Sequence, residues 1–465
     1  MLDGYHELER QEIYFASLSE LNDPMEGFTD ILWQGDRIVW SNLLRHYIVC
    51  LDHACAFVAV AGEAQRIGWQ DIPMVRLDAT VAPQRRVLEE AILTEFLDDE
   101  SVRSFVEALS SRSQPVRRNE LSVYLRHLHT LALAIIYDCY ERYGQMPKQP
   151  SIAELRQKGR KIVAEVARSL PLMNQVEAEH PHMEFSTDSI FLFQRLMLDQ
   201  LRLIHLYNGT VDGTKANKNF LFVDFPDEYV REIEKLIYPR WYTACFMASC
   251  HDSSVWGNYG DRHQGVCLRF KVGSKGGLPA IRVNRIHGFT GDQDIVGPVD
   301  HQFYPVEYTK HHAPVDFFRS MRLPIPTLKS AWFSDRQGNI SPIGQPLFSN
   351  LREWRERWRR DFMRGATCKL EAWNREEEYR LILAEGMLDY STKERRKAKY
   401  DFHDLDGIIF GINTPTEKKL EISKIDETKC RQYNKFDITF YQAYYSREKG
   451  TIDHHELRFL KFTAN

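Results

Sequence analysis

Residues 256–270 read WGNYGDRHQGVCLRF and decide the fold class. The first part, up to Gly265, mixes glycine with polar residues, which is typical of a turn or loop. The second part, from Val266 to Phe270, is mainly apolar and predicts a strand. The stretch therefore predicts a loop that presents polar side chains beside a buried strand, which is where scaffolds commonly carry functional groups.

Similar strand-like runs lie on both sides of this stretch. We predict strands at residues 12–17, 219–224, 241–249, 265–271, 303–309, 379–384, 406–412 and 436–445, and helices at 226–238 and 348–364. Together these elements predict an α+β core with a mixed, mainly antiparallel sheet that the N-terminal strand completes.

The segment from about residue 83 to residue 207 has a different character. Its apolar residues recur at helical spacing, as in Val87, Leu88, Ala91 and Ile92. We therefore predict an all-helical subdomain inserted into the α+β core. The predicted division is residues 1–60 for the first strand and turn of the core, 61–210 for the helical insertion, and 211–465 for the main core domain.

Length and composition restrict the class of protein. The chain has 465 residues, 43% of them hydrophobic, which is enough for a sizeable core. Its 61 basic and 65 acidic residues give a net charge of -4, so global charge does not favour a nucleic-acid or membrane-surface binder. No uncharged apolar run approaches the roughly 18 residues of a membrane span, and the N-terminus does not resemble a secretory signal. We expect a cytoplasmic protein with no membrane partner.

Eight cysteines in a chain of this length are too few for a disulfide scaffold. Two groups were considered as metal ligands: Cys50, His53 and Cys55 form the first, and Cys245, Cys250 and His251 form the second. Neither has the paired CxxC spacing of a zinc site. We interpret these residues as structural thiols and predict no metal ligand.

Three segments concentrate polar residues beside aromatic ones: residues 14–27, 256–270 and 369–382. Their motifs are Asn-Asp-Pro after a Tyr/Phe strand, Trp-x-x-Tyr-x-x-x-His-x-Gly before an apolar strand, and Trp-x-x-Glu-x-Glu-Tyr-Arg. In this order and spacing they resemble the bacterial domain of unknown function family 2971, over residues 12–27 and about 240–412. The resemblance implies a link to anti-phage defence and to a defence-system partner protein.

The pair Glu376 and Glu378 is the leading candidate for chemistry. In a strand, residues two apart point to one face, and two carboxylates there would repel and raise a pKa. Arg375, Arg380 or Lys369 could instead hold them as ordinary salt bridges. A Glu-x-Glu at a strand edge is also similar to the last motif of ADP-ribosyltransferases. That resemblance implies that Glu378 stabilises the oxocarbenium-like transition state and that Glu376 orients the nucleophile.

The same resemblance implies NAD as the cofactor and assigns Tyr14 and Ser17 to the nicotinamide pocket. His263 is the third candidate catalytic residue. The full set of candidate NAD-binding residues is Tyr14, Ser17, Asn22, Asp23, Trp256, Tyr259 and Arg380. The superfamily's first motif is a His or Arg on an upstream strand, and only His6 and Arg10 are available here. We therefore expect the chain to be truncated or divergent from the superfamily at this point.

Three functions therefore stand as hypotheses. The first is an ADP-ribosyltransferase-like enzyme that modifies a macromolecule, either protein or nucleic acid, or hydrolyses NAD. The second is a non-catalytic sensor or scaffold that binds a partner through its helical insertion, with oligomers allowed. The third is a metal-dependent nuclease that uses Asp23, Glu26, Glu376 and Glu378 as magnesium ligands. On the structural alternative, Trp256 and Tyr259 pack in the core and Asn22-Asp23-Pro24 is only a turn.

Overall fold

The computed structural model describes residues 6–75, 82–179, 184–208, 216–291, 293–386 and 388–463. The chain is a mixed α+β protein whose sheets are largely antiparallel, as the sequence predicts. It divides into two compact units. Unit 1 comprises residues 1–29, 239–313 and 362–465, and unit 2 comprises residues 30–238 and 314–361.

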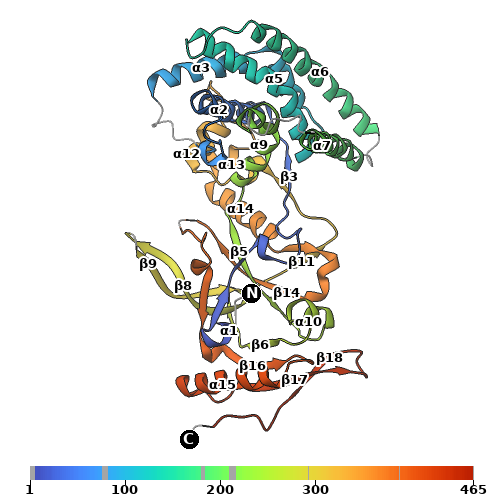
Figure 1. Ribbon diagram of the computed structural model, residues 1–465, viewed down its shortest axis with the longest axis vertical. Helices are drawn as coiled ribbons and strands as arrows, with labels where there is room; N and C mark the ends of the chain where they lie inside the picture. Colours follow the sequence, from blue (N-terminus) through green and yellow to red (C-terminus); the bar gives the residue numbers. More distant parts are fainter. Residues whose placement is uncertain are drawn as a thin grey trace. The chain divides into compact units, whose positions relative to one another are not determined.

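Unit 1 contains the sheet that carries the candidate site. Its strands lie in the order β10 (Tyr304–Pro305), β14 (Glu378–Ala384), β5 (Trp241–Met247) and β2 (Ala16–Ser17), and neighbouring strands are antiparallel. The register pairs Glu378 with Met247 and Ala384 with Trp241. The end of β5 therefore lies beside the start of β14, although about 130 residues separate them in the chain (Figure 1).

A second sheet of unit 1 has the order β18 (Thr451–Glu456), β17 (Thr439–Ser446), β16 (Leu405–Phe410) and β6 (Val266–Phe270). Strands β16 and β17 are parallel, and α15 (Thr416–Tyr433) makes the crossover that a parallel pair requires. The other pairs are antiparallel. This topology brings β18, near the C-terminus, into the same sheet as the predicted strand β6.

Two further arrangements complete unit 1. A further sheet contains β1 (Glu12–Tyr14), β15 (Lys397–Tyr400), β8 (Leu278–Thr290), β7 (Gly273–Lys275) and β9 (Gln293–Gln302). Parallel strands β11 (Glu307–Thr309) and β13 (Cys368–Leu370) form the other. The core between these elements is rich in aromatic side chains, including the fully buried Phe15, Tyr400 and Phe402.

Unit 2 is mainly helical. The predicted helical stretch forms α3 (Pro83–Leu97), α4 (Glu100–Ser110), α5 (Arg118–Arg142), α6 (Ser151–Glu179) and α7 (Glu184–Tyr207). Helix α9 (Phe225–Ile233) and helix α14 (Leu351–Ala366) agree with two further predicted helices. A small sheet of β12 (Pro314–Asp316), β3 (Asp30–Trp33) and β4 (Val116–Arg117) joins distant segments of this unit. Figure 1 labels α3, α5, α6, α7, α9 and α14.

Helix α2 (Arg37–Ala61) is the centre of the core of unit 2. Asp36 caps it by accepting a hydrogen bond from the Ile38 amide at 2.8 Å. By length and composition alone α2 is apolar enough to cross a membrane, although Arg45 and Asp52 interrupt its apolar run. Half of its most apolar window is buried inside the chain, as in the core helix of a globular unit.

Several predicted elements differ from the structure. Residues 219–224 are helical, not a strand, because Phe220–Asp224 forms a π-helical turn that leads into α9. The helical unit begins at Asp30 and includes residues 314–361, whereas we assigned both segments to the core. The predicted boundary at residues 210 and 211 lies outside the described residues. The long β8–β9 hairpin was not predicted.

Candidate functional site

Unit 1 contains a buried cluster of charged side chains at the start of β14. It consists of Glu26, Lys369, Glu376, Glu378 and Arg380, each at most 9% exposed. The Lys369 ammonium lies 2.7 Å from Glu376, 3.2 Å from Glu378 and 3.4 Å from Glu26. Arg380 lies 2.8 Å from Glu378 and 2.6 Å from Glu26. Charges so deeply buried are stable only when they are paired in this way.

The local backbone explains how the two glutamates of the Glu-x-Glu motif meet. Glu376 ends a 3₁₀ helix, Glu377 has a left-handed φ of 44°, and Glu378 begins β14. The two residues therefore do not share a strand, so the alternation of side chains along a strand does not explain their approach. Their carboxylates converge because each binds Lys369, which projects from β13. The Glu378 amide also donates a hydrogen bond to the Tyr308 hydroxyl at 2.9 Å.

Three carboxylates face two cations in this cluster, so negative charges outnumber positive ones by one. Burial raises the pKa of Glu26 above its ordinary value. Burial also acts to raise the pKa of Glu378, but the hydrogen bonds and charge of Arg380, with the charge of Lys369, outweigh it and lower that pKa. Glu26 is therefore the carboxyl of this pair that takes up a proton more readily. The same anions raise the pKa of Lys369 against the opposing effect of burial.

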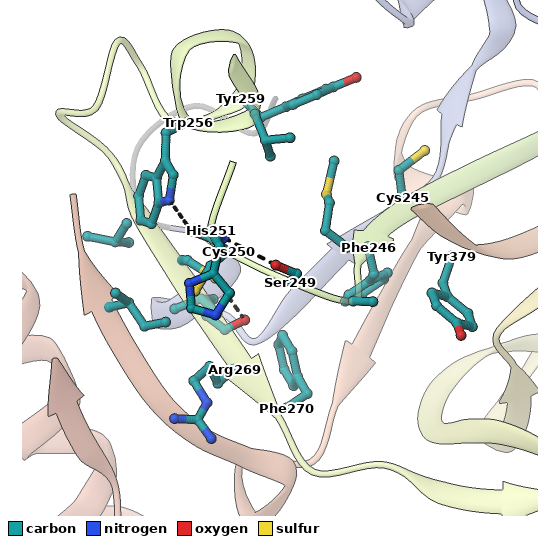
Figure 2. A pocket seen from close by; sticks show the side chains of 18 of the residues that line it. Cys245, Phe246, Ser249, Cys250, His251, Trp256, Tyr259, Arg269, Phe270 and Tyr379 are labelled. Carbon is teal, nitrogen blue, oxygen red and sulfur yellow. Dashed lines mark hydrogen bonds between the residues drawn. The ribbon is translucent and has the colours of Figure 1, made fainter. Parts of the chain in front are cut away.

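A pocket of about 670 Å³ lies in the same unit, at the end of β5 and beside β6 and α10 (Ser253–Tyr259). Its aromatic lining residues are Phe246, Trp256, Tyr259, Phe270, Phe303 and Tyr379. Arg269, His251 and His454 add nitrogen groups, and no aspartate or glutamate is among the described residues that line it. In the view of Figure 2, Trp256 and Tyr259 lie on one side of the pocket and Arg269 and Phe270 on the other.

Tyr259 connects the pocket with the buried cluster. Its hydroxyl lies 2.7 Å from Glu376 Oε1 and 3.1 Å from Asn22 Oδ1. The hydroxyl has a single proton, and a carboxylate is the stronger acceptor, so the proton goes to Glu376. Burial and the hydrogen bond to Glu376 both raise the pKa of Tyr259. The Tyr259 ring is thus held at the pocket wall by a buried anion.

The structure brings together some of the predicted site residues. Asn22, Tyr259, Glu376, Glu378 and Arg380 belong to one connected network. Trp256 also lines the pocket, and its indole nitrogen donates to the Cys250 carbonyl at 2.7 Å. Glu376, Glu378 and Arg380 are not among the residues that line the pocket.

Tyr14 and Ser17 belong to a separate group. Both hydroxyls donate to the Glu20 carboxylate, at 3.0 and 2.8 Å, and Arg396 binds the same carboxylate at 2.7 Å. Burial and the bond to Glu20 raise the pKa of Tyr14 to about 12. Neither Tyr14 nor Ser17 lines the pocket. Residues His6–Glu9 form helix α1 where the resemblance implies an upstream strand.

His263 has a clear structural role. It is the last of three consecutive residues with left-handed φ, after Asp261 and Arg262. Its carbonyl accepts a hydrogen bond from the Asn413 amide at 3.0 Å, and its amide donates to the Trp256 carbonyl at 3.3 Å. A Cβ at Gly411 would lie 2.3 Å from the His263 carbonyl oxygen, so only glycine fits there. His263 closes the loop after α10 and is not among the pocket residues.

The proposed magnesium ligands do not form an open cation site. Lys369 already occupies the position between Glu26, Glu376 and Glu378, and a cation there competes with its ammonium. Asp23 is buried and caps its own turn, with Oδ1 accepting from the Met25 amide at 2.9 Å. Asp23 therefore stabilises a turn, as expected if Asn22-Asp23-Pro24 has only a structural role.

Sequence reasoning missed Arg269 and His454. Arg269 lies within residues 256–270, but it reaches the pocket wall because its strand, β6, pairs with the distant strand β16. His454 lies about 200 residues after Cys250 in the chain, and no local spacing connects the two.

Comparisons with protein-family models, with curated proteins and with solved structures find no match to this chain.

Proposed function

We propose that unit 1 binds a nucleotide-class ligand in the pocket of β5, β6 and α10, with NAD as the first candidate. The composition of the pocket wall carries this proposal. Aromatic rings can stack on the planar base or nicotinamide. Arg269, which is partly exposed and lies 3.2 Å from Asp406, can also pair with a phosphate, and no carboxylate is among the described residues that line the pocket. The volume of about 670 Å³ lies within the range of small-molecule sites.

The geometry changes the roles of the two glutamates. Direct contact of Glu378 with a ligand is disfavoured, because its side chain is 2% exposed and both carboxylate oxygens bind Arg380 or Lys369. We propose that Glu376 and Glu378 are positioning residues, which act through Tyr259 and through the start of β14. We therefore propose ligand binding and assign no transfer step to these carboxylates. The ADP-ribosyltransferase-like fold and the likeness to family 2971 remain predictions from the motifs.

A calorimetric titration of the full chain with NAD, ADP-ribose, AMP and nicotinamide tests the proposal. We expect NAD to bind, and Arg269→Met to weaken that binding at least tenfold, equivalent to about 1.4 kcal/mol. Arg282→Met is the matched control, because Arg282 pairs with Asp300 on the β8–β9 hairpin and does not line the pocket. Absence of binding by every member of this panel would overturn the proposal. Nicotinamide release in the same samples shows whether the bound NAD reacts.

A second candidate function, a scaffold, is favoured by helix α7 of unit 2. This helix exposes a long run of large apolar side chains: Ile190, Leu192, Phe193, Leu196, Met197, Leu198, Leu201, Leu203, Ile204, Leu206 and Tyr207. An exposed apolar surface of this extent is typical of a protein interface.

We propose a second copy of the chain as the partner of α7. The face of α7 that carries Phe191 and Arg195 packs on its own unit, where Arg195 donates a hydrogen bond to Asn119 at 3.1 Å. The exposed apolar run is left for a partner, and the same run on a second copy is apolar in the same way and can cover it. The oligomeric state of the chain, measured by light scattering, tests this candidate independently of NAD.

A further inference from the structure

Three metal-ligand side chains meet at the wall of the pocket. Cys250 and His251 follow the end of β5, and His454 projects from β18, some 200 residues later. Each residue offers one donor atom, and these atoms lie within 4.8 Å of one another. All three residues line the pocket, and Figure 2 shows Cys250 and His251 together there.

The Cys250–His454 distance is already that of two ligands on one metal ion. Cys250 Sγ lies 3.6 Å from His454 Nδ1. Zinc bonds of about 2.3 Å to sulfur and about 2.0 Å to nitrogen, at a tetrahedral angle, separate the two donor atoms by about 3.6 Å. The third donor atom, from His251, lies within 4.8 Å of the other two, and His251 is exposed, so a small side-chain adjustment completes the set.

His251 is oriented in the manner of a metal-binding histidine. Its Nδ1 lies 2.9 Å from the Ile452 carbonyl oxygen. A carbonyl only accepts, so Nδ1 carries the proton and the lone pair of the imidazole is on Nε2. A hydrogen bond from the distal ring nitrogen to a carbonyl is the usual second-shell support of a ligating histidine.

The backbone around the three side chains is firmly held. The Cys250 carbonyl accepts from the Trp256 indole at 2.7 Å, and the His251 carbonyl accepts from the Ile452 amide at 3.1 Å and the Thr451 hydroxyl at 2.8 Å. Cys250 packs on a small core that includes Ile409 and Ile452. These contacts fix the end of β5 against β18, so the distance between the donors is built into the fold.

We propose that Cys250, His251 and His454 form a zinc-binding site. A thiolate and two imidazoles favour Zn²⁺ over the oxygen-preferring Mg²⁺ and Ca²⁺. Three protein ligands leave a fourth tetrahedral position, which is the arrangement of zinc sites that bind an exchangeable water or ligand. Since all three residues line the pocket, the fourth ligand comes from the pocket. This inference goes beyond nucleotide binding and does not depend on it.

The test uses the metal alone, added to the purified full chain. Co²⁺ reports a thiolate ligand by a sulfur-to-cobalt charge-transfer band, and Zn²⁺ affinity follows from competition with a chromophoric chelator. We expect one Zn²⁺ per chain and a charge-transfer band that Zn²⁺ abolishes. Cys250→Ser should remove the band, and His454→Ala and His251→Ala should each weaken Zn²⁺ binding at least tenfold.

Matched controls lie beside each ligand. Cys267→Ser removes another thiol of the pocket wall, and His455→Ala removes the next histidine of β18. Both should retain the band and the affinity. Circular dichroism shows which variants are folded, and the exposed His251 gives a ligand variant that is expected to fold normally. Absence of stoichiometric Zn²⁺ binding to the wild-type chain, or equal binding by the folded ligand variants and the controls, would overturn the proposal.

Discussion

The Tyr259 hydroxyl lies 2.7 Å from a carboxylate oxygen of Glu376. This contact joins the wall of the pocket to a charged cluster that is otherwise closed to solvent. It gives a physical reason for a tyrosine in the Trp-x-x-Tyr motif, because a phenylalanine would leave the carboxylate with one partner fewer.

Tyr259→Phe tests this connection. The ring remains at the pocket wall, but the Glu376 carboxylate loses the hydrogen bond that the Tyr259 hydroxyl donates to it. A hydrogen bond to a charged group is worth about 1.5–3 kcal/mol. We expect a lower free energy of unfolding of unit 1, measured by hydrogen exchange of the β14 amides. Tyr444→Phe is the control, because Tyr444 is as exposed as Tyr259, at 40% against 39%, and lies on β17 outside the charged cluster. An unchanged exchange rate in Tyr259→Phe would show that the contact contributes nothing to stability.

Glu378→Gln should strongly destabilise unit 1. The substitution leaves Arg380 and Lys369 short of a buried partner, and breaking a buried ion pair in this way costs about 3–5 kcal/mol. The amide exchange rates of β14 should rise accordingly, whereas Glu307→Gln, at an exposed position of β11, should change them little. A variant as stable as wild type would favour a strained, ligand-contacting carboxylate over the positioning role.

The same variant should change the pH dependence of stability. The folded pKa of Glu378 is lowered, so its ionised form contributes stability above the ordinary value near 4.5 and this contribution is lost as the pH falls below that value. Glu26, whose pKa is raised, acts in the opposite sense and loses its contribution as the pH rises through its folded pKa. The stability difference between wild type and Glu378→Gln should therefore shrink as the pH falls below about 4.5. Urea unfolding at several pH values measures it, and a constant difference would contradict the assignment.

Leu203→Glu should reduce self-association if α7 is the interface. Leu203 is 67% exposed, so a charged residue is tolerated in the monomer but would be buried in a pair of α7 helices. We expect the wild type to form dimers in light scattering and the variant to shift toward monomers. Val87→Glu, at another exposed apolar position of unit 2, should leave the dimer intact. A monomeric wild type would contradict self-association.

Local sequence patterns predicted much of the fold. The helical spacing of residues 83–207 and the strand at Val266–Phe270 were correct because apolar periodicity reports directly which face is buried. The prediction of a strand at residues 219–224 was wrong, because aromatic and β-branched residues are also accommodated in a helical turn. The division into units was harder, since β3 pairs with β12, which is nearly 300 residues away in the chain.

The candidate site was predictable only in part. The motifs marked Tyr259, Glu376, Glu378 and Arg380, and the structure joins these residues in one network. Whether a carboxylate of this network can contact a ligand depends on whether Lys369 and Arg380 already bind it. Those contacts arise from tertiary packing, which local sequence patterns do not show. The approach of His454 to Cys250 likewise depends on the pairing of β17 with β18.

The most direct test of the account is hydrogen exchange of the full chain with and without saturating NAD. If the pocket of unit 1 is the binding site, NAD protects peptides that cover residues 245–259 and 266–270 and leaves residues 12–17 unchanged. Protection confined to residues 12–17 or to unit 2, or no protection anywhere, would contradict it.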